Sequence, residues 1–213
     1  MKILFDGFTE LVMNQDLDSE KSVDINLKID EFIRISSLLL EDTIICAGGF
    51  EIDINNPDQR QFWRRSFVRS LFAAIEGLTF QYKQLAKEIA KYNRVEFSSS
   101  EIALLNDESY VLNNKGEASV QEAKLKTVEN MLFSLFMLAK SCKREFAINK
   151  GTEWDAFLKT RKIRDRITHP KKLEHVRITI KEVSTIRTAV IWIVNSVNGQ
   201  AIEFIRDFQA SQK

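Results

Sequence analysis

The chain has 213 residues, of which 44% are hydrophobic and 29% charged, a balance typical of a globular protein with one elaborated domain or two small ones. Two prolines and seven glycines favour long uninterrupted helices, and no apolar run approaches the roughly 18 residues of a membrane span. The net charge of +1 is unevenly distributed, because residues 1–57 carry 4 Lys/Arg against 12 Asp/Glu and residues 58–213 carry 27 against 18.

This asymmetry predicts an acidic N-terminal extension, residues 1–57, joined to a basic domain, residues 58–213. The basic part could meet a polyanion, although an acidic flank that neutralises its neighbour explains the same pattern. Cys46 and Cys142 have no CxxC spacing and are typical of reduced, buried thiols. Because the first residues lack the apolar stretch of a signal peptide, we expect a cytoplasmic protein without a membrane segment.

The first predicted elements are a strand and a helix. Apolar and polar residues alternate over residues 22–29, which predicts a short strand. Residues 30–47 are rich in Ile, Leu and Phe and predict a helix that Gly48 and Gly49 end.

A long helix is predicted to begin at Asn56 and Pro57, with asparagine as N-cap and proline in the first helical position. Apolar residues recur at three- and four-residue steps, so this helix should run to about Asn93. Its first half carries Arg60, Arg64, Arg65 and Arg69. We interpret these arginines as a solvated flank with packed aromatics, and nucleic-acid binding is the alternative.

The middle of the chain changes character before helical periodicity returns. Ser98 to Glu101 is typical of the cap of a short helical turn. Residues 110–120 predict a small hairpin around an Asn-Asn-Lys-Gly turn, and residues 121–148 predict another helix.

Two further helices complete the expected fold. Residues 152–155 resemble a capping box with Asp in place of Glu, and the helix they begin should end near Thr168, because Pro170 disfavours helical geometry at His169. A last helix is predicted from about Thr179. The fold class is therefore all-α, a helical bundle with a small β-hairpin excursion and an N-terminal extension.

The end of the helix before Pro170 is the most basic neighbourhood of the chain. Its cations, apart from Arg164, are Lys159, Arg161, Lys162, Arg166, Lys171 and Lys172. Cations at a helix C-terminus complement its dipole, which explains the lysines without any ligand. The same cluster predicts contacts with the phosphates of a nucleic acid.

One of only two histidines, His169, follows Arg164 by five residues. In a continuous helix these side chains would lie about 140° apart, but a helix that ends before Pro170 lets the ring of His169 turn back. Such a histidine could take the proton of a ribose 2′-hydroxyl and return one to the leaving oxygen. Arg164 could stabilise charge on the phosphate oxygens, so this chemistry needs no metal and no cofactor.

Other candidate sites are weaker. His175 lies in a charged connector and is expected to be solvated. The sequence contains no Gly-rich phosphate loop and no HExxH motif, and its two histidines and two scattered cysteines disfavour a zinc site.

The stretch Lys162-Ile163-Arg164-Asp165-Arg166-Ile167-Thr168-His169-Pro170 resembles the signature of the HEPN superfamily (higher eukaryotes and prokaryotes nucleotide-binding domain). In that signature an arginine and a polar residue precede a spacer and a histidine near a helix end. Residues 67–77 resemble the early core helix of prokaryotic members, on which a polar residue can support the site. The resemblance covers about residues 58–210 and leaves the acidic extension outside.

The resemblance implies a metal-independent endoribonuclease in which two protomers bring their motifs together in one composite site. It implies a role in a toxin–antitoxin or phage-defence system, with RNA, a second copy and possible antitoxin or other protein as partners. Carried over by position, Arg164 and His169 are the catalytic pair and Asp165 orients the arginine. Glu76 is a supporting residue that could pair with Arg164, and Thr168 caps the helix end.

Two other functions fit the same sequence. Some HEPN members have lost activity, so the chain could be a non-catalytic module that binds nucleic acid, a nucleotide or a protein partner. A helix bundle that serves only as an assembly scaffold is the third possibility.

Overall fold

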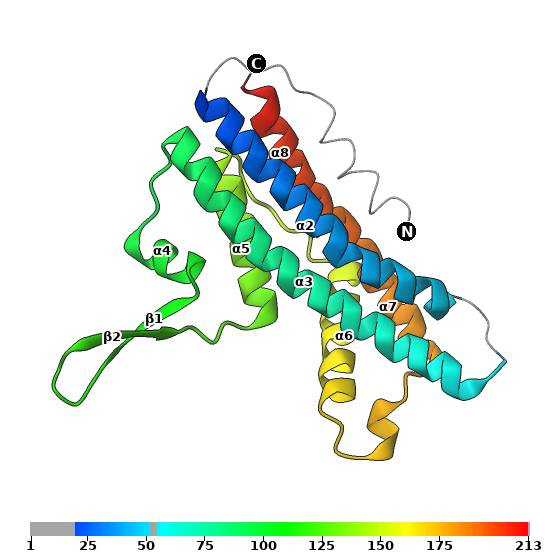
Figure 1. The fold of residues 1–213 in the computed structure, drawn as a ribbon. Coiled ribbons are helices and arrows are strands. Elements are labelled where there is room, and N and C mark those ends of the chain that lie inside the picture. Colours follow the sequence, from blue (N-terminus) through cyan, green and yellow to red (C-terminus); the bar gives the residue numbers. More distant parts are fainter. Residues whose placement is uncertain (1–19, 52–54, 213) are drawn as a thin grey trace. The chain divides into compact units, whose positions relative to one another are not determined.

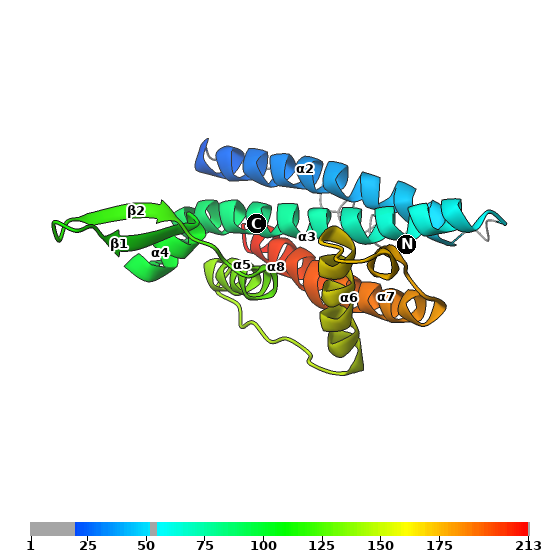
Figure 2. The same ribbon diagram turned by 90° about the horizontal axis from the view of Figure 1, so that it is seen from below.

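The computed structural model describes residues 20–51 and 55–212, with side chains from residue 24 onward. This part of the chain is mostly helical and contains one two-stranded antiparallel sheet (Figures 1 and 2). The long helices are α2 (Glu20–Glu51), α3 (Pro57–Asn93), α5 (Thr127–Ser141), α6 (Thr152–Thr168), α7 (Ile180–Trp192) and α8 (Gly199–Ala210). The short elements are α4 (Ser99–Leu105), β1 (Glu108–Leu112), β2 (Ala118–Glu122), the 3₁₀ turn η2 (Leu173–Val176) and the π-helical segment η3 (Ile193–Asn198).

The described residues form two compact units, each assembled from segments far apart in the sequence. The first unit contains residues 33–51, 55–78 and 147–203, and the second contains residues 20–32, 79–146 and 204–212. None of the described helices is long and apolar enough to cross a membrane. An all-α fold class is thus confirmed at this level, while the division at residue 57 stays a prediction.

Helix α2 corrects two expectations. The strand predicted over residues 22–29 is wrong, because these residues are helical. Ile25 and Ile29 are buried one helical turn apart, whereas Leu27 between them is 60% exposed, so the apparent alternation is half of a helical stripe. The helix also continues through Gly48 and Gly49, which were expected to end it.

Gly49 marks a close approach of two helices. A Cβ atom added there would overlap the ring of Trp63 on α3, whereas a Cβ added at Gly48 would meet nothing within 4 Å. Next to this contact, the rings of Phe50 and Phe67 lie 4.7 Å apart between centroids. The glycine therefore serves the packing of α2 on α3 and not the end of a helix.

This difference gives a matched pair of substitutions in the first unit. Gly49→Ala is expected to lower the free energy of unfolding by about 1–3 kcal/mol through overpacking against the Trp63 ring. Gly48→Ala should instead raise it by about 0.5–1 kcal/mol, since alanine is the better helix former. The three tryptophans, Trp63, Trp154 and Trp192, all lie in the first unit, so urea unfolding followed by their fluorescence measures both changes. Equal effects of the two substitutions would contradict the packing role of Gly49.

Helix α3 begins and ends as expected. The side-chain oxygen of Asn56 accepts hydrogen bonds from the backbone N–H groups of Asp58 and Gln59, at 2.9 and 3.2 Å, as an N-cap does. At the other end Arg94 adopts a left-handed conformation (φ 53°), and the N–H of Val95 donates to the carbonyl of Ala90 at 2.9 Å. This is the geometry of a Schellman motif, which ends a helix without glycine here.

The second unit contains the predicted hairpin and short helix. Tyr110 pairs with Val120 in the β1–β2 register. The side chain of Lys83 is fully buried. Its ammonium donates to Asp107 at 2.6 Å and to the carbonyl of Leu104 at 2.9 Å, and these bonds fix the junction between α4 and β1.

The helix predicted over residues 121–148 is shorter at both ends. Strand β2 extends to Glu122, and α5 begins only at Thr127. At its end Lys143 has φ 57° and the N–H of Arg144 donates to Ala139 at 2.9 Å, a second Schellman motif.

Glu101 ties α4 to α5 and makes stability depend on pH. Its carboxylate completes the capping box of Ser98 and accepts from the Lys140 ammonium at 2.7 Å. Burial by itself would raise the pKa of Glu101, but the hydrogen bonds from Lys140 and Ser98 outweigh it and hold the pKa below its ordinary value. A lowered folded-state pKa stabilises the fold above the unfolded value of about 4.3, and this is lost as the pH falls through the folded-state pKa.

Glu101→Gln is therefore expected to weaken α4 at pH 7 by about 1 kcal/mol, because the pair is partly exposed and glutamine still caps. The difference between wild type and variant should shrink as the pH falls below about 4.3, and it should vanish once the pH lies below the folded-state pKa, where the carboxyl is protonated in both states. Hydrogen exchange of the α4 amides over this pH range measures the difference. A gap that does not shrink as the pH is lowered from 7 to 2 would contradict the ion-pair explanation.

Helices α6 and α7 pack aromatic side chains into the first unit. Phe157 on α6 stacks on Phe72 of α3 and on Trp192 of α7, with centroids 6.0 and 4.8 Å apart. The capping box predicted at Thr152 is wrong: Gly151 is the N-cap of α6 and makes no side-chain cap bond. The expected last helix does begin after Thr179, which forms a capping box with Glu182, but it passes through the π-helical segment η3.

Candidate active site

The two segments that carry the family resemblance meet in the first unit. A guanidinium nitrogen (Nη2) of Arg164 on α6 lies 2.7 Å from a carboxylate oxygen of Glu76 on α3, although 88 residues separate them. The other terminal nitrogen, Nη1, donates to Asp165 at 3.2 Å. The guanidinium carbon also lies 5.8 Å from the centre of the Phe72 ring. The pairing expected between Glu76 and Arg164 is therefore present.

Packing of α6 explains where these charges lie. Phe157, Thr160, Ile163 and Ile167 are buried, so this face of α6 packs into the first unit. Arg164 follows the buried Ile163 and is half-buried, with 26% of its side chain exposed, which places a positive charge at the edge of the core. Two carboxylates beside it compensate for the lost hydration of that charge.

The end of α6 lies where the sequence predicts it. Thr168 is the last helical residue and His169 is the C-cap, with φ −122° and ψ 63°. The N–H of His169 donates to the carbonyl of Asp165 at 3.0 Å, and Nη2 of Arg69 on α3 donates to the carbonyl of Ile167 at 2.9 Å. The first is the last bond of the helical pattern, and the second satisfies a carbonyl that the helix end leaves without an intrahelical partner. The cap position predicted for Thr168 is thus occupied by His169.

His169 itself is exposed. Within the described residues its imidazole makes no hydrogen bond or ion pair, and the hydrogen bonds of Arg164 go to Glu76 and Asp165 instead. The structure therefore brings Arg164, Glu76 and Asp165 together and leaves the histidine open to solvent.

The six basic residues predicted to contact nucleic acid fall into two groups. Lys159, Lys162, Lys171 and Lys172 are exposed, whereas Arg161 and Arg166 are half-buried. The ammonium of Lys172 lies 3.8 Å from Glu174, a weak exposed pair. The Nε atom of Arg161 is buried without a hydrogen-bond partner among the described residues. The four lysines are thus the cations that a polyanion could reach directly.

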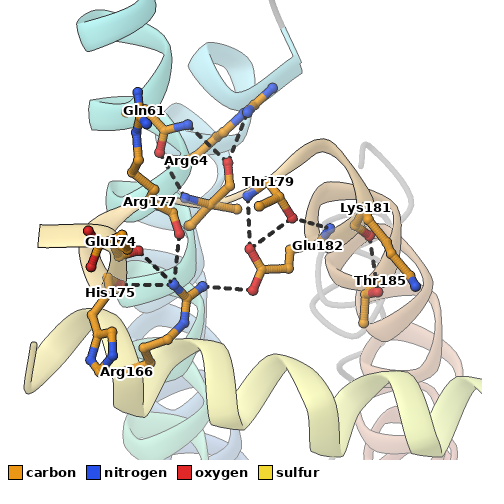
Figure 3. A network of polar contacts seen from close by, with 11 residues as sticks. Gln61, Arg64, Arg166, Glu174, His175, Arg177, Thr179, Lys181, Glu182 and Thr185 are labelled. Atoms are coloured by element: carbon orange, nitrogen blue, oxygen red, sulfur yellow. Dashed lines mark hydrogen bonds and ion pairs between the residues drawn. The ribbon is translucent and has the colours of Figure 1, made fainter. Parts of the chain in front are cut away.

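Arg166 holds residues 171–179, the segment that follows the motif (Figure 3). Its Nη1 lies 3.2, 3.1 and 2.9 Å from the carbonyl oxygens of Glu174, His175 and Arg177, and its Nη2 lies 2.7 Å from a carboxylate oxygen of Glu182. Glu182 in turn caps the start of α7. The planar guanidinium suits this role, because its donors are fixed in a fork. In the structure Arg166 thus positions the chain after His169.

A row of polar side chains on α3 holds the same segment from the other side. The amide of Gln61 exchanges two hydrogen bonds of 2.9 Å with the backbone of Ile178, and Nη1 of Arg64 donates to the same carbonyl at 3.1 Å (Figure 3). Nη1 of Arg65 lies 3.4 Å from the carbonyl oxygen of Val176. The interpretation of the α3 arginines as a flank that only solvent contacts is wrong for Arg64, Arg65 and Arg69, because all three donate to backbone carbonyls, although Arg69 is also exposed.

Sequence reasoning missed this function of α3, although a signal existed. Gln61, Arg65 and Arg69 recur at four-residue steps, so they share one face of the helix. Such a polar row on a helix with an apolar opposite face predicts contacts with other backbone. It does not predict which segment supplies the carbonyls.

The described residues offer little for other chemistry. They contain no group of three or more His, Cys, Asp or Glu side chains that could hold a metal ion. In the second unit burial raises the pKa of the Cys142 thiol to about 12, although the hydrogen bond with Ser141 opposes this, so the thiol is not a nucleophile near neutral pH. His175 is half-buried and its Nδ1 lies 3.3 Å from the N–H of Lys171.

Comparison of the chain with protein-family models, curated proteins and solved structures finds no match. The resemblance to the HEPN superfamily therefore depends on the motif and on the helix that contacts it.

Proposed function

We propose that this protein is a metal-independent endoribonuclease of the HEPN type, which cleaves RNA through attack by the ribose 2′-hydroxyl. Its catalytic pair is Arg164 and His169, and two protomers contribute to one composite site. Following the resemblance, we place this activity in a toxin–antitoxin or phage-defence system.

One observation carries the proposal: the ion pair of 2.7 Å between Arg164 and Glu76. It joins the motif to the one other segment that resembles the family, and it fixes the arginine near the end of α6. A guanidinium has five N–H donors, of which Glu76 and Asp165 take two, so three remain for phosphate oxygens. A guanidinium held in place suits the bidentate geometry of a phosphate.

The reaction then needs a base, an acid and charge stabilisation. The 2′-oxygen forms a bond to the adjacent phosphorus as the base takes its proton, and the bond between phosphorus and the 5′-oxygen breaks as the acid protonates that oxygen. The products are a 2′,3′-cyclic phosphate and a 5′-hydroxyl. Arg164 stabilises the negative charge that grows on the phosphate oxygens.

A composite site explains how one histidine per protomer performs both proton transfers. A concerted step uses an unprotonated base and a protonated acid together. Two copies of His169, one from each protomer, supply the two groups. The open position of His169 at the end of α6 leaves room for that arrangement.

A non-catalytic binding module is the second candidate function. It is favoured by the two carboxylates on Arg164, which reduce its net charge, and by the absence of any hydrogen bond to the ring of His169 from the described residues. Such a module would bind a nucleic acid, a nucleotide or a protein without cleavage.

Incubation of the purified protein with a labelled RNA in excess EDTA separates these functions. We expect cleavage of the RNA and none of a DNA of the same sequence, because DNA lacks the attacking 2′-hydroxyl. Cleavage that requires an added divalent metal, or equal cleavage of the DNA, would contradict the proposal. Binding of RNA without cleavage would favour the second candidate.

A further inference from the structure

A pocket of about 650 Å³ lies in the first unit, between the beginning of α3 and the segment that follows the motif. Its basic lining consists of Arg60, Arg64, Arg65 and Arg177. The acidic side chains on its lining are Asp58 and Glu174, so the lining carries a net charge of +2. A concave, positively charged surface concentrates anionic ligands.

The walls of the pocket are held by hydrogen bonds that do not need a ligand. The reciprocal bonds between Gln61 and Ile178 and the bond from Arg64 to the same residue fix α3 against the segment. Arg166 holds the carbonyl of Arg177 at 2.9 Å from the other side. A ligand would therefore enter a largely preformed site, which lowers the entropy lost on binding.

Two large apolar side chains on the lining face solvent. Leu173 is 79% exposed and Ile180 is 75% exposed. Apolar surface beside cations suits a ligand that alternates charged phosphates with flat bases, since each base has an apolar face. Within the described residues, the guanidinium of Arg177 makes no hydrogen bond or ion pair and so remains open to a phosphate.

The pocket adjoins the candidate active site along the chain. Leu173 follows His169 by four residues, which span at most about 14 Å even when fully extended. A strand bound at His169 can therefore reach the pocket with its next nucleotides.

We infer that this pocket is a subsite for the RNA strand next to the cleaved bond. Arg177 and Arg60 contact its phosphates, and Leu173 and Ile180 contact its bases. The inference rests on the proposed function for the identity of the strand and adds the place where the strand is held.

The double substitution Arg60→Gln and Arg177→Gln tests the subsite. Both proteins compared carry His169→Ala as well, so that the labelled RNA stays intact during the measurement. We expect RNA binding to weaken by about tenfold, because two charge-assisted contacts are lost. The slope of log affinity against log salt concentration should fall by about 1.4, since each phosphate contact on a single strand contributes about 0.7.

Arg34→Gln with Arg94→Gln is the matched control, since both arginines are exposed and neither lines this pocket. It removes the same charge, and binding should change less than twofold. An unchanged melting temperature excludes loss of the fold as the cause. Equal weakening by both pairs, or no weakening by the pocket pair, would overturn the inference.

The outcome for the subsite is distinguishable from the outcome for the proposed function. Cleavage by the protein without an effect of the pocket pair would overturn the subsite alone. Weaker binding by the pocket pair, in a protein that never cleaves RNA, would support the pocket as a place where RNA is held and contradict the catalytic proposal.

Discussion

Replacing His169 with alanine is expected to lower the rate of RNA cleavage by a factor of about 10²–10⁴, the usual contribution of a general acid or base. The imidazole is exposed at the C-cap of α6 and holds none of the described residues in place, so its removal should leave the fold unchanged. RNA binding should change little, because we assign the phosphate contacts to arginines and lysines. Single-turnover kinetics with excess enzyme measures the chemical step.

The only other histidine is the matched control. His175 lies six residues further along the chain and its ring accepts a hydrogen bond from the Lys171 N–H at 3.3 Å. His175→Ala should keep the cleavage rate within about threefold, since it removes one weak, partly exposed hydrogen bond. Full activity of His169→Ala, or equal losses in the two variants, would contradict the assignment of His169 as the catalytic residue.

Arg166→Met is expected to lower the free energy of unfolding of the first unit by about 2–4 kcal/mol. Hydrogen bonds to a charged group contribute about 1.5–3 kcal/mol each, but water can replace part of those to exposed carbonyls. The substitution removes donors from three carbonyls and leaves Glu182, on which the start of α7 depends, without its cation. Arg166→Lys should recover less than half of the loss, because an ammonium cannot reproduce the planar fork.

Lys162→Met on the same helix provides the comparison for Arg166. Lys162 is exposed and makes no hydrogen bond or ion pair among the described residues, so its replacement should change stability by less than about 0.5 kcal/mol. Urea unfolding monitored by tryptophan fluorescence reports on the first unit for both variants. If Arg166→Met unfolds at the same urea concentration as Lys162→Met, Arg166 does not hold the segment.

The helices with local signals were predictable from sequence. Asn56 and Pro57 predict the start of α3, and Pro170 predicts the end of α6, because these residues restrict the backbone conformation in their immediate neighbourhood. The beginning of α2 is predicted as a strand, since a window of eight residues cannot separate a two-residue period from half of a helical stripe. The role of Gly49 cannot be predicted locally, because the side chain that requires a glycine there, Trp63, belongs to another helix.

Other helix boundaries depend on backbone conformations that the residue types do not predict. Helices α3 and α5 end at Arg94 and Lys143 in left-handed geometry, where a sequence pattern leads one to expect glycine. The π-helical segment η3 lies inside a continuous apolar pattern.

The candidate site likewise contains features that the sequence predicts and features that it does not. Arg164 and His169 stand out by their residue types and spacing, whereas the pairing of Arg164 with Glu76 could be predicted only from the family resemblance of the helix that carries Glu76. The bonds from Arg64 and Arg166 to backbone carbonyls could not be predicted, because every residue offers a carbonyl and only the fold selects among them.

The chemical ends of the cleaved RNA test the proposed reaction most directly. An RNA of defined sequence is cut in excess EDTA, and the new ends are identified by mass spectrometry before any enzymatic repair. Attack by the 2′-hydroxyl, with Arg164 and His169 at the phosphate, predicts a 2′,3′-cyclic phosphate on one fragment and a 5′-hydroxyl on the other. A 5′-phosphate with a 3′-hydroxyl, or RNA that remains intact, would contradict it.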